Sequence, residues 1–179
     1  FAKYVLLVDK SKRKLFVFER DNESLKLKEE LPTDIGKKSG NKTKRDDHRT
    51  PEGIYFFEQI LTQPEIPFET YGSQAFTTNY PNIFDKLNGK TGSGIWLHSI
   101  PDSVPLTRGS RGCVVVRNKE IKNLGKYIEL KQTPIIIYDE LNFVTKKEHD
   151  IQREQMSQYI EEWRQAWESS NFEKYQNFY

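Results

Sequence analysis

The stretch WLHSIPDSVPLTRGSRGCVVVRN (residues 96–118) holds two apolar segments separated by a polar connection. Short apolar runs bounded by glycine and proline are typical of β-strands, so GIWLHS (94–99) and GCVVVRN (112–118) predict two core strands. The connection between them contains two prolines and a glycine, which allow the chain to turn back. Two neighbouring strands would then bring His98 close to Cys113, the only cysteine of the chain.

Further runs on both sides of this stretch also predict strands. They are rich in Val, Ile, Leu, Phe and Tyr, and they are YVLLVD (4–9), RKLFVFER (13–20), SLKLKEEL (24–31), GIYFFEQI (53–60) and TPIIIYDEL (133–141). The first is apolar enough for a strand buried on both faces, whereas the alternation of Leu and Lys in the third predicts a half-exposed strand. Asn118 is expected to cap a short helix over 119–128. Many short strands and few helices predict a mainly β domain that ends near residue 144.

Two connections interrupt these strands. Residues 36–53 are polar and lack apolar periodicity, which predicts a loop. Its cluster of Lys and Arg is typical of a solvated surface, and contact with an anionic ligand is the alternative. Residues 61–93 contain several Pro and Gly, and we expect a long connection with short strands that folds over a groove.

The period of the apolar residues changes after residue 144. One face at helical spacing carries Met156, Tyr159, Ile160, Trp163, Ala166 and Trp167. The sequence SSN (169–171) offers a new N-cap, and a second helical stripe begins at Phe172 and Tyr175. This aromatic face either packs back on the β domain or begins a second domain, and we favour the second. The expected domains are 1–144 and an amphipathic helical segment over 145–179.

Composition excludes several classes of function. The 28 Lys and Arg nearly balance the 26 Asp and Glu, which argues against a nucleic-acid binder that neutralises phosphates over its whole surface. One cysteine rules out an intrachain disulfide framework or a thiolate-rich zinc site, and we expect no metal and no cofactor.

His48 and His149 are expected to be solvated. No apolar run approaches the ~20 residues of a membrane span. The chain begins at Phe1, so a removed targeting segment would not be visible, and the oligomeric state is not predicted.

A thiol becomes a useful nucleophile as the thiolate, which needs a base or a positive field nearby. His98 would be that base, and Arg108 and Arg111 would favour the thiolate. The glycine of GSRGC lets backbone amides approach a reacting carbonyl, so the amide of Cys113, with Gly112 as a second candidate, would form an oxyanion hole. By spacing alone, however, a lone cysteine is more often a small buried hydrophobe.

The residues His98-Ser99 and Ser110-Arg111-Gly112-Cys113 resemble the catalytic motif of the L,D-transpeptidase (YkuD-type) family. HRTPEGIYFF (48–57) is similar to a strand entry of that family, and SQAFTTNYPNIFDK (73–86) is similar to a block of its YafK-like branch. Together these segments cover roughly residues 4 to 140. The resemblance implies a mainly β fold, an L,D-transpeptidase-like β-sandwich with short helices, followed here by the C-terminal helical segment.

The resemblance also implies roles for individual residues. Cys113 would be the acylated nucleophile and His98 its general base, with Ser99 orienting the imidazole through its backbone carbonyl. Gly112 would help to shape the turn that presents the thiol. The residues expected at the substrate are Trp96, Tyr80, Ser110, Arg111, Arg117 and Asn118. The family usually has His where this chain has Arg111, and a guanidinium cannot accept a proton at neutral pH, so the enzyme would be crippled if that second His were the base. We take His98 as the base, because Ser99 follows it as the family pattern expects.

The substrates of the family are peptidoglycan stem peptides, cleaved before the terminal D-Ala, and the acyl group then passes to an amine or to water. Such a substrate implies a location outside the cytoplasmic membrane, in the periplasm or cell envelope. EEWRQAWESSNFEKYQNFY (161–179) resembles the opening helices of an NTF2-like domain. An L,D-transpeptidase-like domain followed by such helices is similar to the L,D-carboxypeptidases that set cell shape, which trim a tetrapeptide to a tripeptide. Two alternatives stay open. The first is a binding module whose catalytic residues have decayed and which binds cell-wall polymer through its basic 37–49 loop. The second is an unrelated β domain with a structural cysteine.

Overall fold

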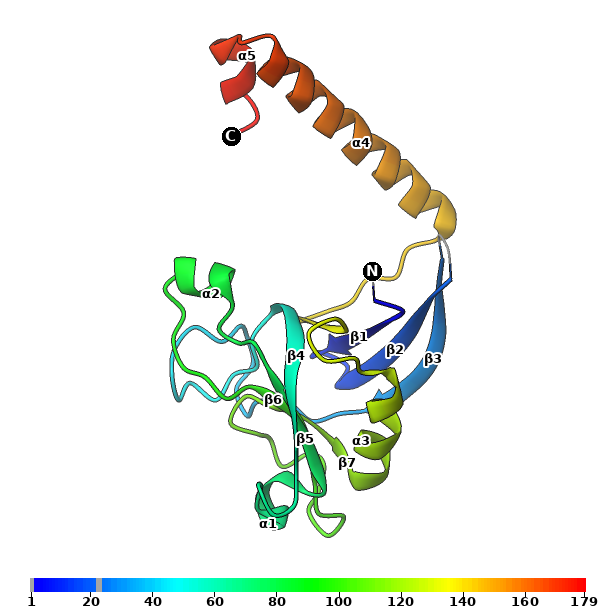
Figure 1. Cartoon of the computed structure of the whole chain (residues 1–179), viewed down its shortest axis with the longest axis vertical. Helices are drawn as coiled ribbons and strands as arrows, with labels where there is room; N and C mark the ends of the chain where they lie inside the picture. Colours follow the sequence, from blue (N-terminus) through cyan, green and yellow to red (C-terminus); the bar gives the residue numbers. More distant parts are fainter. Residues whose placement is uncertain (1, 22–23) are drawn as a thin grey trace. The chain divides into compact units, whose positions relative to one another are not determined.

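The computed structural model describes residues 2–21 and 24–179 (Figure 1). The chain divides into two compact units, Phe1–Leu141 and Asn142–Tyr179. The first contains the strands and the short helices, and the second contains the two C-terminal helices. The boundary expected from sequence, after residue 144, falls a few residues beyond this division.

The strands of the first unit form one continuous eight-stranded sheet. They are β1 (Tyr4–Asp9), β2 (Lys14–Asp21), β3 (Ser24–Pro32), β4 (Gly53–Thr62), β5 (Gln74–Thr78), β6 (Trp96–Ile100), β7 (Val114–Arg117) and β8 (Pro134–Tyr138). Their order across the sheet is β3-β2-β1-β8-β4-β5-β6-β7. The pairs β1–β8 and β6–β7 are parallel and the other neighbours are antiparallel. The mainly β fold with short helices and a C-terminal helix is confirmed, and its sheet is curled (Figure 1).

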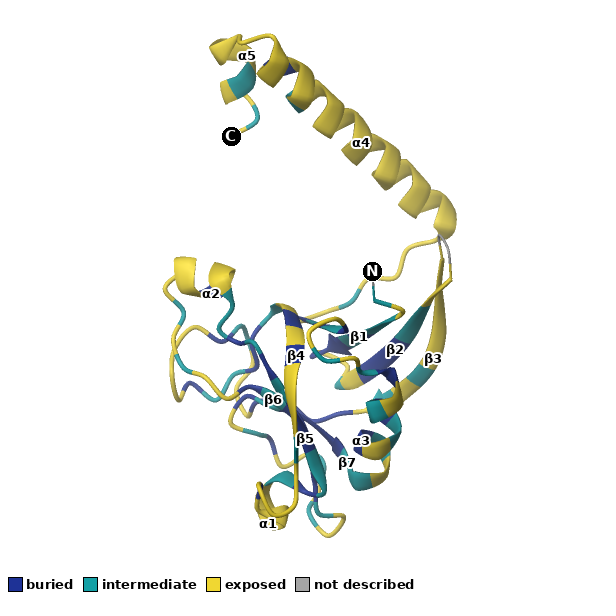
Figure 2. Cartoon of the chain, viewed as in Figure 1, coloured by how far each residue is buried: buried dark blue, intermediate teal, exposed yellow. Residues whose placement is uncertain are grey.

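The core lies on the inner face of this sheet. Buried residues concentrate in the strands, as Figure 2 shows. Fully buried side chains come from most strands of the sheet, and the larger ones are Leu6, Leu15, Tyr55, Phe57, Phe76, Leu97, Ile135 and Ile137. Each such side chain contributes about 1.5–3 kcal/mol by leaving water. The low overall apolar content is therefore enough, because large side chains are gathered on one face.

Strand β3 differs from the half-exposed strand that its alternation predicts. Leu25 and Leu27 are 56% and 47% exposed, and the lysines between and after them are exposed as well. The reason is topological, since β3 lies at the edge of the sheet and pairs only with β2 within it. Exposed lysines on such an edge discourage pairing with another chain.

A short bridge joins the chain just after β3 to the other end of the sheet. Asp34 pairs with Val115 of β7, and Gly36 pairs with Ser110. The carboxylate of Asp34 is buried and accepts hydrogen bonds from Arg13 (2.9 Å) and from the backbone N–H of Gly109 (2.6 Å). These contacts fix the loop that leads into the predicted catalytic cysteine.

Short helices fill the connections. They are α1 (Phe68–Tyr71), α2 (Ile83–Leu87), α3 (Asn118–Leu124) and the 3-10 turn η1 (Gly125–Tyr127). The 61–93 connection thus contains two helices besides β5. The prediction that Asn118 caps a helix by its side chain is wrong, because Arg117 occupies the N-cap position without a side-chain cap. The amide oxygen of Asn118 instead accepts a hydrogen bond from the backbone N–H of Ser73 (2.8 Å).

The second unit consists of α4 (Lys146–Glu168) and α5 (Phe172–Gln176). Thr145 and Glu148 form a capping box at the start of α4, and Asn171 caps α5, as the sequence SSN predicts. Aromatic side chains join the two helices, with the ring centroids of Trp167 and Tyr175 5.6 Å apart. None of the helices in the described residues combines the length and apolar character that crossing a bilayer requires.

Candidate active site

The parallel pair β6–β7 brings the predicted nucleophile and base to one pocket. His98 lies opposite Val115 in the register, and Cys113 directly precedes β7. A pocket of about 540 Å³ opens at this place. It is lined by Lys37, Lys42, Arg45, Asp46, Thr70, Tyr71, Gly92, Ser93, Gly94, Ile95, His98, Arg108, Gly109, Ser110, Arg111 and Cys113. A sulfur and an imidazole therefore face the same cavity.

His98 is held in one tautomer by its neighbour. The side chain is 5% exposed, and Nδ1 lies 2.7 Å from the backbone carbonyl oxygen of Ser99. A carbonyl only accepts, so Nδ1 carries the proton and donates it, which leaves Nε2 with a free lone pair. Burial lowers the pKa of His98 to about 4, an effect that the positive charge of Arg108 adds to and the Ser99 contact opposes. The imidazole is therefore neutral near pH 7 and able to accept a proton.

Tyr71 is a pocket residue that the sequence did not reveal. Its ring contacts the imidazole of His98 edge-on, with centroids 5.1 Å apart, and packs on Trp96 at 4.9 Å. Burial raises the pKa of Tyr71, and a charge on Cys113 raises it further. Tyr71 lies in a connection with no strand or motif pattern, so no signal in the sequence singles it out.

Ser99 is fully buried behind the imidazole. Its hydroxyl accepts a hydrogen bond from the backbone N–H of Ser73 (2.9 Å) and reaches the carbonyl of Tyr71 (3.3 Å). Asn118 accepts from the same N–H. Both side chains therefore hold the turn that follows α1, and with it the position of the Tyr71 ring.

The thiol of Cys113 is partly exposed to the pocket and donates a hydrogen bond to the carbonyl oxygen of Gly94 (3.4 Å). Burial raises the pKa of Cys113 to about 11, whereas a hydrogen bond with the backbone of Trp96 and, to a smaller extent, the positive charge of Lys42 lower it. The prediction that Arg108 and Arg111 favour the thiolate needs correction. Arg111 is exposed and forms an ion pair with Asp46 (3.2 Å), and Arg108 acts on His98. Lys42 is the cation that lowers the thiol pKa.

The turn before the cysteine is held by Ser110. Its hydroxyl donates to the carbonyl of Cys113 (2.7 Å) and accepts from the N–H of Gly112 (3.0 Å). Gly112 has φ +132°, and a Cβ there would lie 2.7 Å from the carbonyl oxygen of Arg49. Glycine is therefore required at this position. The Gly112 N–H is engaged by Ser110, which makes it the weaker of the two predicted oxyanion donors.

Four of the residues expected at the substrate do not line the pocket. Tyr80 is 4% exposed, and its hydroxyl donates to the carbonyl of Thr91 (3.2 Å). Arg117 donates to the carbonyl of Val104 (2.6 Å) and so holds the loop between β6 and β7. The remaining two, Trp96 and Asn118, support the Tyr71 wall, as described above. Tyr80 belongs to the core because it packs on Tyr55, with ring centroids 5.7 Å apart.

The other two histidines lie outside the pocket lining. His149 is exposed at the start of α4, as expected. His48 is only half-buried rather than solvated, and its Nδ1 is buried without a hydrogen-bond partner. Within residues 2–21 and 24–179 no three His, Cys, Asp or Glu side chains converge on a point where they would hold a metal ion.

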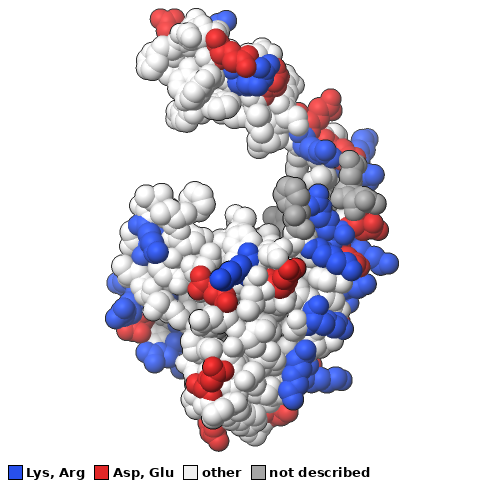
Figure 3. All heavy atoms as spheres, viewed as in Figure 1, with Lys and Arg blue, Asp and Glu red and all other residues white. Residues whose placement is uncertain are grey.

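Positive charge dominates the pocket wall. Asp46 is its one carboxylate, whereas its cations are Lys37, Lys42, Arg45, Arg108 and Arg111. Three of these come from the 36–53 loop, so part of the basic cluster of that loop lines the cavity, while Lys38 and Lys44 of the same loop are exposed and outside the lining. On the face of the molecule shown in Figure 3, side chains of both signs are interspersed. The excess of positive charge is therefore local to this pocket, and such a wall attracts anionic groups.

Comparisons with known proteins identify relatives of this chain. Residues 3–137 match the sequence model of the L,D-transpeptidase catalytic domain, YkuD. The solved structure of Bdellovibrio bacteriovorus Bd1075 is 62% identical, with TM-score 0.82, over 100% of this chain and 63% of that one. The structure of the helical cell shape determining protein Pgp2 of Campylobacter jejuni is 27% identical, with TM-score 0.76. The match covers 98% of this chain and 60% of Pgp2. An L,D-transpeptidase of Xylanimonas cellulosilytica is 16% identical, with TM-score 0.51 over 76% and 61%, which shows the fold alone. No curated protein sequence matches.

Proposed function

The chain belongs to the L,D-transpeptidase (YkuD) catalytic domain family, and from this premise we propose that it is a cysteine acyl-transfer enzyme acting on peptidoglycan stem peptides. The family acts on peptidoglycan in the cell envelope. The observation that carries the proposal is the shared pocket of His98 and Cys113. His98 and Cys113 both line this cavity, and the carbonyl of Ser99 keeps the imidazole in the tautomer that accepts a proton at Nε2.

In the proposed reaction the thiol attacks the carbonyl carbon of the peptide bond before the terminal D-Ala. The S–H proton passes to Nε2 of His98 as the S–C bond forms, and the amide of Cys113 stabilises the tetrahedral oxyanion. Collapse breaks the C–N bond, and His98 returns the proton to the leaving amine of D-Ala. An amine or a water molecule then attacks the thioester and restores the thiol.

The protonation states of the free site support a general-base mechanism. With the pKa of His98 lowered to about 4 and that of Cys113 raised to about 11, the pair is neutral at pH 7. Proton transfer therefore accompanies the attack and does not precede substrate binding. The family's usual second His is not needed for this step, and Arg111 in its place lies exposed beside Asp46.

Substitution of the nucleophile tests the proposal. Cys113→Ala should reduce the release of D-Ala from a purified tetrapeptide stem by roughly a thousandfold or more, because no covalent intermediate forms. Ser110→Ala loses the two hydrogen bonds that close the turn but keeps the thiol, so it should reduce turnover far less than Cys113→Ala. Unchanged activity in Cys113→Ala, with a wild-type thermal unfolding curve, would refute the assignment.

The acceptor is the finer part of the proposal, and we favour water, which makes the enzyme an L,D-carboxypeptidase. The support is the similarity to Pgp2, a protein described as determining helical cell shape. We further propose that the unit Asn142–Tyr179 is part of an NTF2-like domain, since residues 161–179 resemble the opening helices of such a domain. The chain spans 63% of the length of Bd1075 and 60% of that of Pgp2. Incubation with muropeptides, followed by mass spectrometry, distinguishes the outcomes. Tripeptide supports hydrolysis, and cross-linked dimers or exchange with added D-amino acid would show transfer to an amine.

A binding module with a decayed catalytic set is the second candidate. Arg111, in place of the usual histidine, is the observation that favours it, together with the basic pocket wall. This candidate predicts that wild type and Cys113→Ala bind cell-wall polymer equally and that neither releases D-Ala. Turnover by the wild type excludes it.

A further inference from the structure

Lys42 is a buried cation in the wall of the pocket. It is 3% exposed, whereas the other lining cations, Lys37, Arg45, Arg108 and Arg111, are all exposed. A charge in contact with water is screened by solvent and salt, and a buried one is screened much less. Lys42 is therefore the pocket cation whose field reaches the cavity with the least loss.

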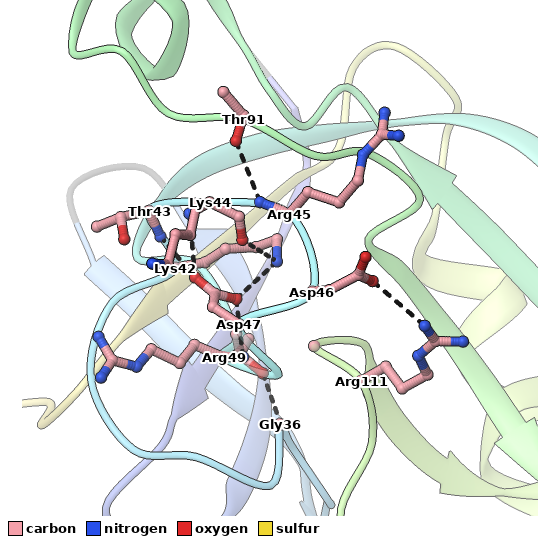
Figure 4. Close-up of polar contacts among 12 residues, drawn as sticks. Gly36, Lys42, Thr43, Lys44, Arg45, Asp46, Asp47, Arg49, Thr91 and Arg111 are labelled. Atoms are coloured by element: carbon pink, nitrogen blue, oxygen red, sulfur yellow. Dashed lines mark hydrogen bonds and ion pairs between the residues drawn. The ribbon is translucent and has the colours of Figure 1, made fainter.

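The ammonium of Lys42 is held in place by its own loop. Its Nζ donates to Oδ1 of Asp47 (2.7 Å) and to the carbonyl oxygen of Lys44 (3.1 Å). Figure 4 shows the side chain running under the loop to meet both acceptors. A lysine that only formed a surface ion pair would be free to move, whereas this one is fixed at both its stem and its head.

Asp47 forms its hydrogen bonds with residues of its own loop. Its carboxylate accepts from Lys42 and from the backbone N–H groups of Thr43 (2.9 Å), Lys44 (3.1 Å) and Arg49 (3.1 Å). Burial would raise the pKa of Asp47, but these hydrogen bonds outweigh it and hold the pKa well below its ordinary value. The negative charge of Asp47 is thus stabilised by three backbone amides as well as by Lys42.

The stem of Lys42 also packs against the strand entry that holds the thiol. Its Cε lies 3.4 Å from the position that a Cβ at Gly92 would occupy. Two residues later, the carbonyl of Gly94 accepts the hydrogen bond of the Cys113 thiol. The loop cation and the sulfur therefore flank one short segment of the pocket wall.

We propose that Lys42 is a positioning residue whose fixed ammonium stabilises the Cys113 thiolate as its proton leaves. This inference rests on the function proposed above and supplies what that function needs, a positive field at the sulfur. Arg111 supplies less of it, because its side chain is exposed to solvent, where it pairs with Asp46 (Figure 4).

The remaining titratable groups around the sulfur do not account for such a field. His98 is neutral near pH 7, and Tyr71 has a pKa above its ordinary value, so it is neutral as well. Asp46 is negative and exposed and would disfavour a thiolate. The exposed cations named above contribute through water, which weakens them.

The test uses the pH dependence of thiol alkylation in the full chain. Cys113 is the one cysteine, so the rate of modification by iodoacetamide, followed by mass spectrometry, reports on a single group. Lys42→Met should raise the thiol pKa by at least about half a unit, which is roughly a threefold slower alkylation at pH 8. Lys37→Met, at an exposed lysine of the same pocket, is the matched control and should leave the pKa within about 0.2 units.

Asp47→Asn should shift the thiol pKa in the direction opposite to Lys42→Met. Removal of its negative charge leaves Lys42 less compensated, so the thiol pKa should fall. A merely structural role predicts that both variants loosen the loop and shift the pKa in the same direction. Equal directions in Lys42→Met and Asp47→Asn, or no shift in Lys42→Met, would overturn the inference.

Lys42→Met leaves the Asp47 carboxylate buried without its cation and is therefore at risk of unfolding. The double variant Lys42→Met/Asp47→Asn removes both charges and keeps the test decisive. Its thiol pKa should lie above that of Asp47→Asn alone, and an equal or lower value would contradict the role of Lys42. Alkylation requires no substrate, so this result is independent of whether the chain turns over stem peptides.

Discussion

At the scale of single residues, the chemistry depends on where one proton resides. Burial lowers the pKa of His98 and raises the pKa of Cys113, because it disfavours the charged form of each group, the imidazolium and the thiolate. The neutral pair is thus the stable form over a wide range of pH. An ion pair formed before substrate binding, as expected when exposed arginines lower the thiol pKa, is not what this pocket favours.

This arrangement predicts the pH dependence of the reaction. Protonation of His98 removes the base, so kcat/KM should fall as the pH drops toward about 4. Between roughly pH 6 and pH 9 neither group titrates, and kcat/KM should stay nearly flat if the substrate does not titrate there. The rate of Cys113 alkylation should still be rising above pH 9, because the thiol pKa is about 11. An alkylation rate that reaches a plateau near pH 7 would show a preformed thiolate and contradict the neutral pair.

At the scale of elements, the catalytic turn is defined by what it touches. Ser110 closes the turn by two hydrogen bonds, and the carbonyl of Arg49 occupies the space in which a side chain at Gly112 would lie. The loop 36–53 therefore packs directly against the turn that presents the nucleophile. Precise placement of the sulfur depends on contact between segments that are far apart in sequence.

Gly112→Ala tests this contact. The new Cβ would lie 2.7 Å from a backbone oxygen and would also require φ +132°, so something must move. We expect a loss of at least about 2 kcal/mol in the free energy of unfolding by urea, together with a large fall in kcat. Gly89→Ala is the control, because Gly89 also has positive φ (+67°) but open space around it, and it should lose only about 1–2 kcal/mol. Equal losses in both variants would show that the contact with Arg49 is unimportant.

Strands and motif could be predicted from the sequence because their signals are local. YVLLVD at 4–9 coincides with β1, and the strand starting at Pro134 coincides with β8. The bridge from Asp34 to Val115 has no such signal, since it joins residues from opposite ends of the sheet. Tyr71 reaches the imidazole for the same reason, through a turn held by Ser99 and Asn118. Tyr80 was expected at the site from its place in a proline-rich connection, but its aromatic ring is more stable in the core.

At the scale of the whole molecule, charge is balanced overall and unbalanced at one place. The formal net charge is +2, yet the pocket wall carries several cations and one carboxylate. A sum over the sequence cannot reveal this, because it averages over every loop. The fold gathers Lys37, Lys42 and Arg45 from one loop and Arg108 and Arg111 from another around a single cavity.

The concentration of charge predicts how salt affects the proposed reaction. A stem peptide carries free carboxylates, and their attraction to exposed cations is screened as the Debye length falls from roughly 14 Å to 4 Å between about 50 mM and 500 mM salt. The KM should therefore rise several-fold over this range, while kcat changes little, because Lys42, the cation proposed to act on the sulfur, is buried and little screened by salt. A stem peptide whose carboxylates are amidated, except the one on the leaving D-Ala, should show a weaker dependence. A kcat that falls with salt while KM stays constant would show that the exposed cations act on the chemical step and not on substrate binding. That result would contradict the assignment of substrate binding to the exposed cations and of the chemical step to Lys42.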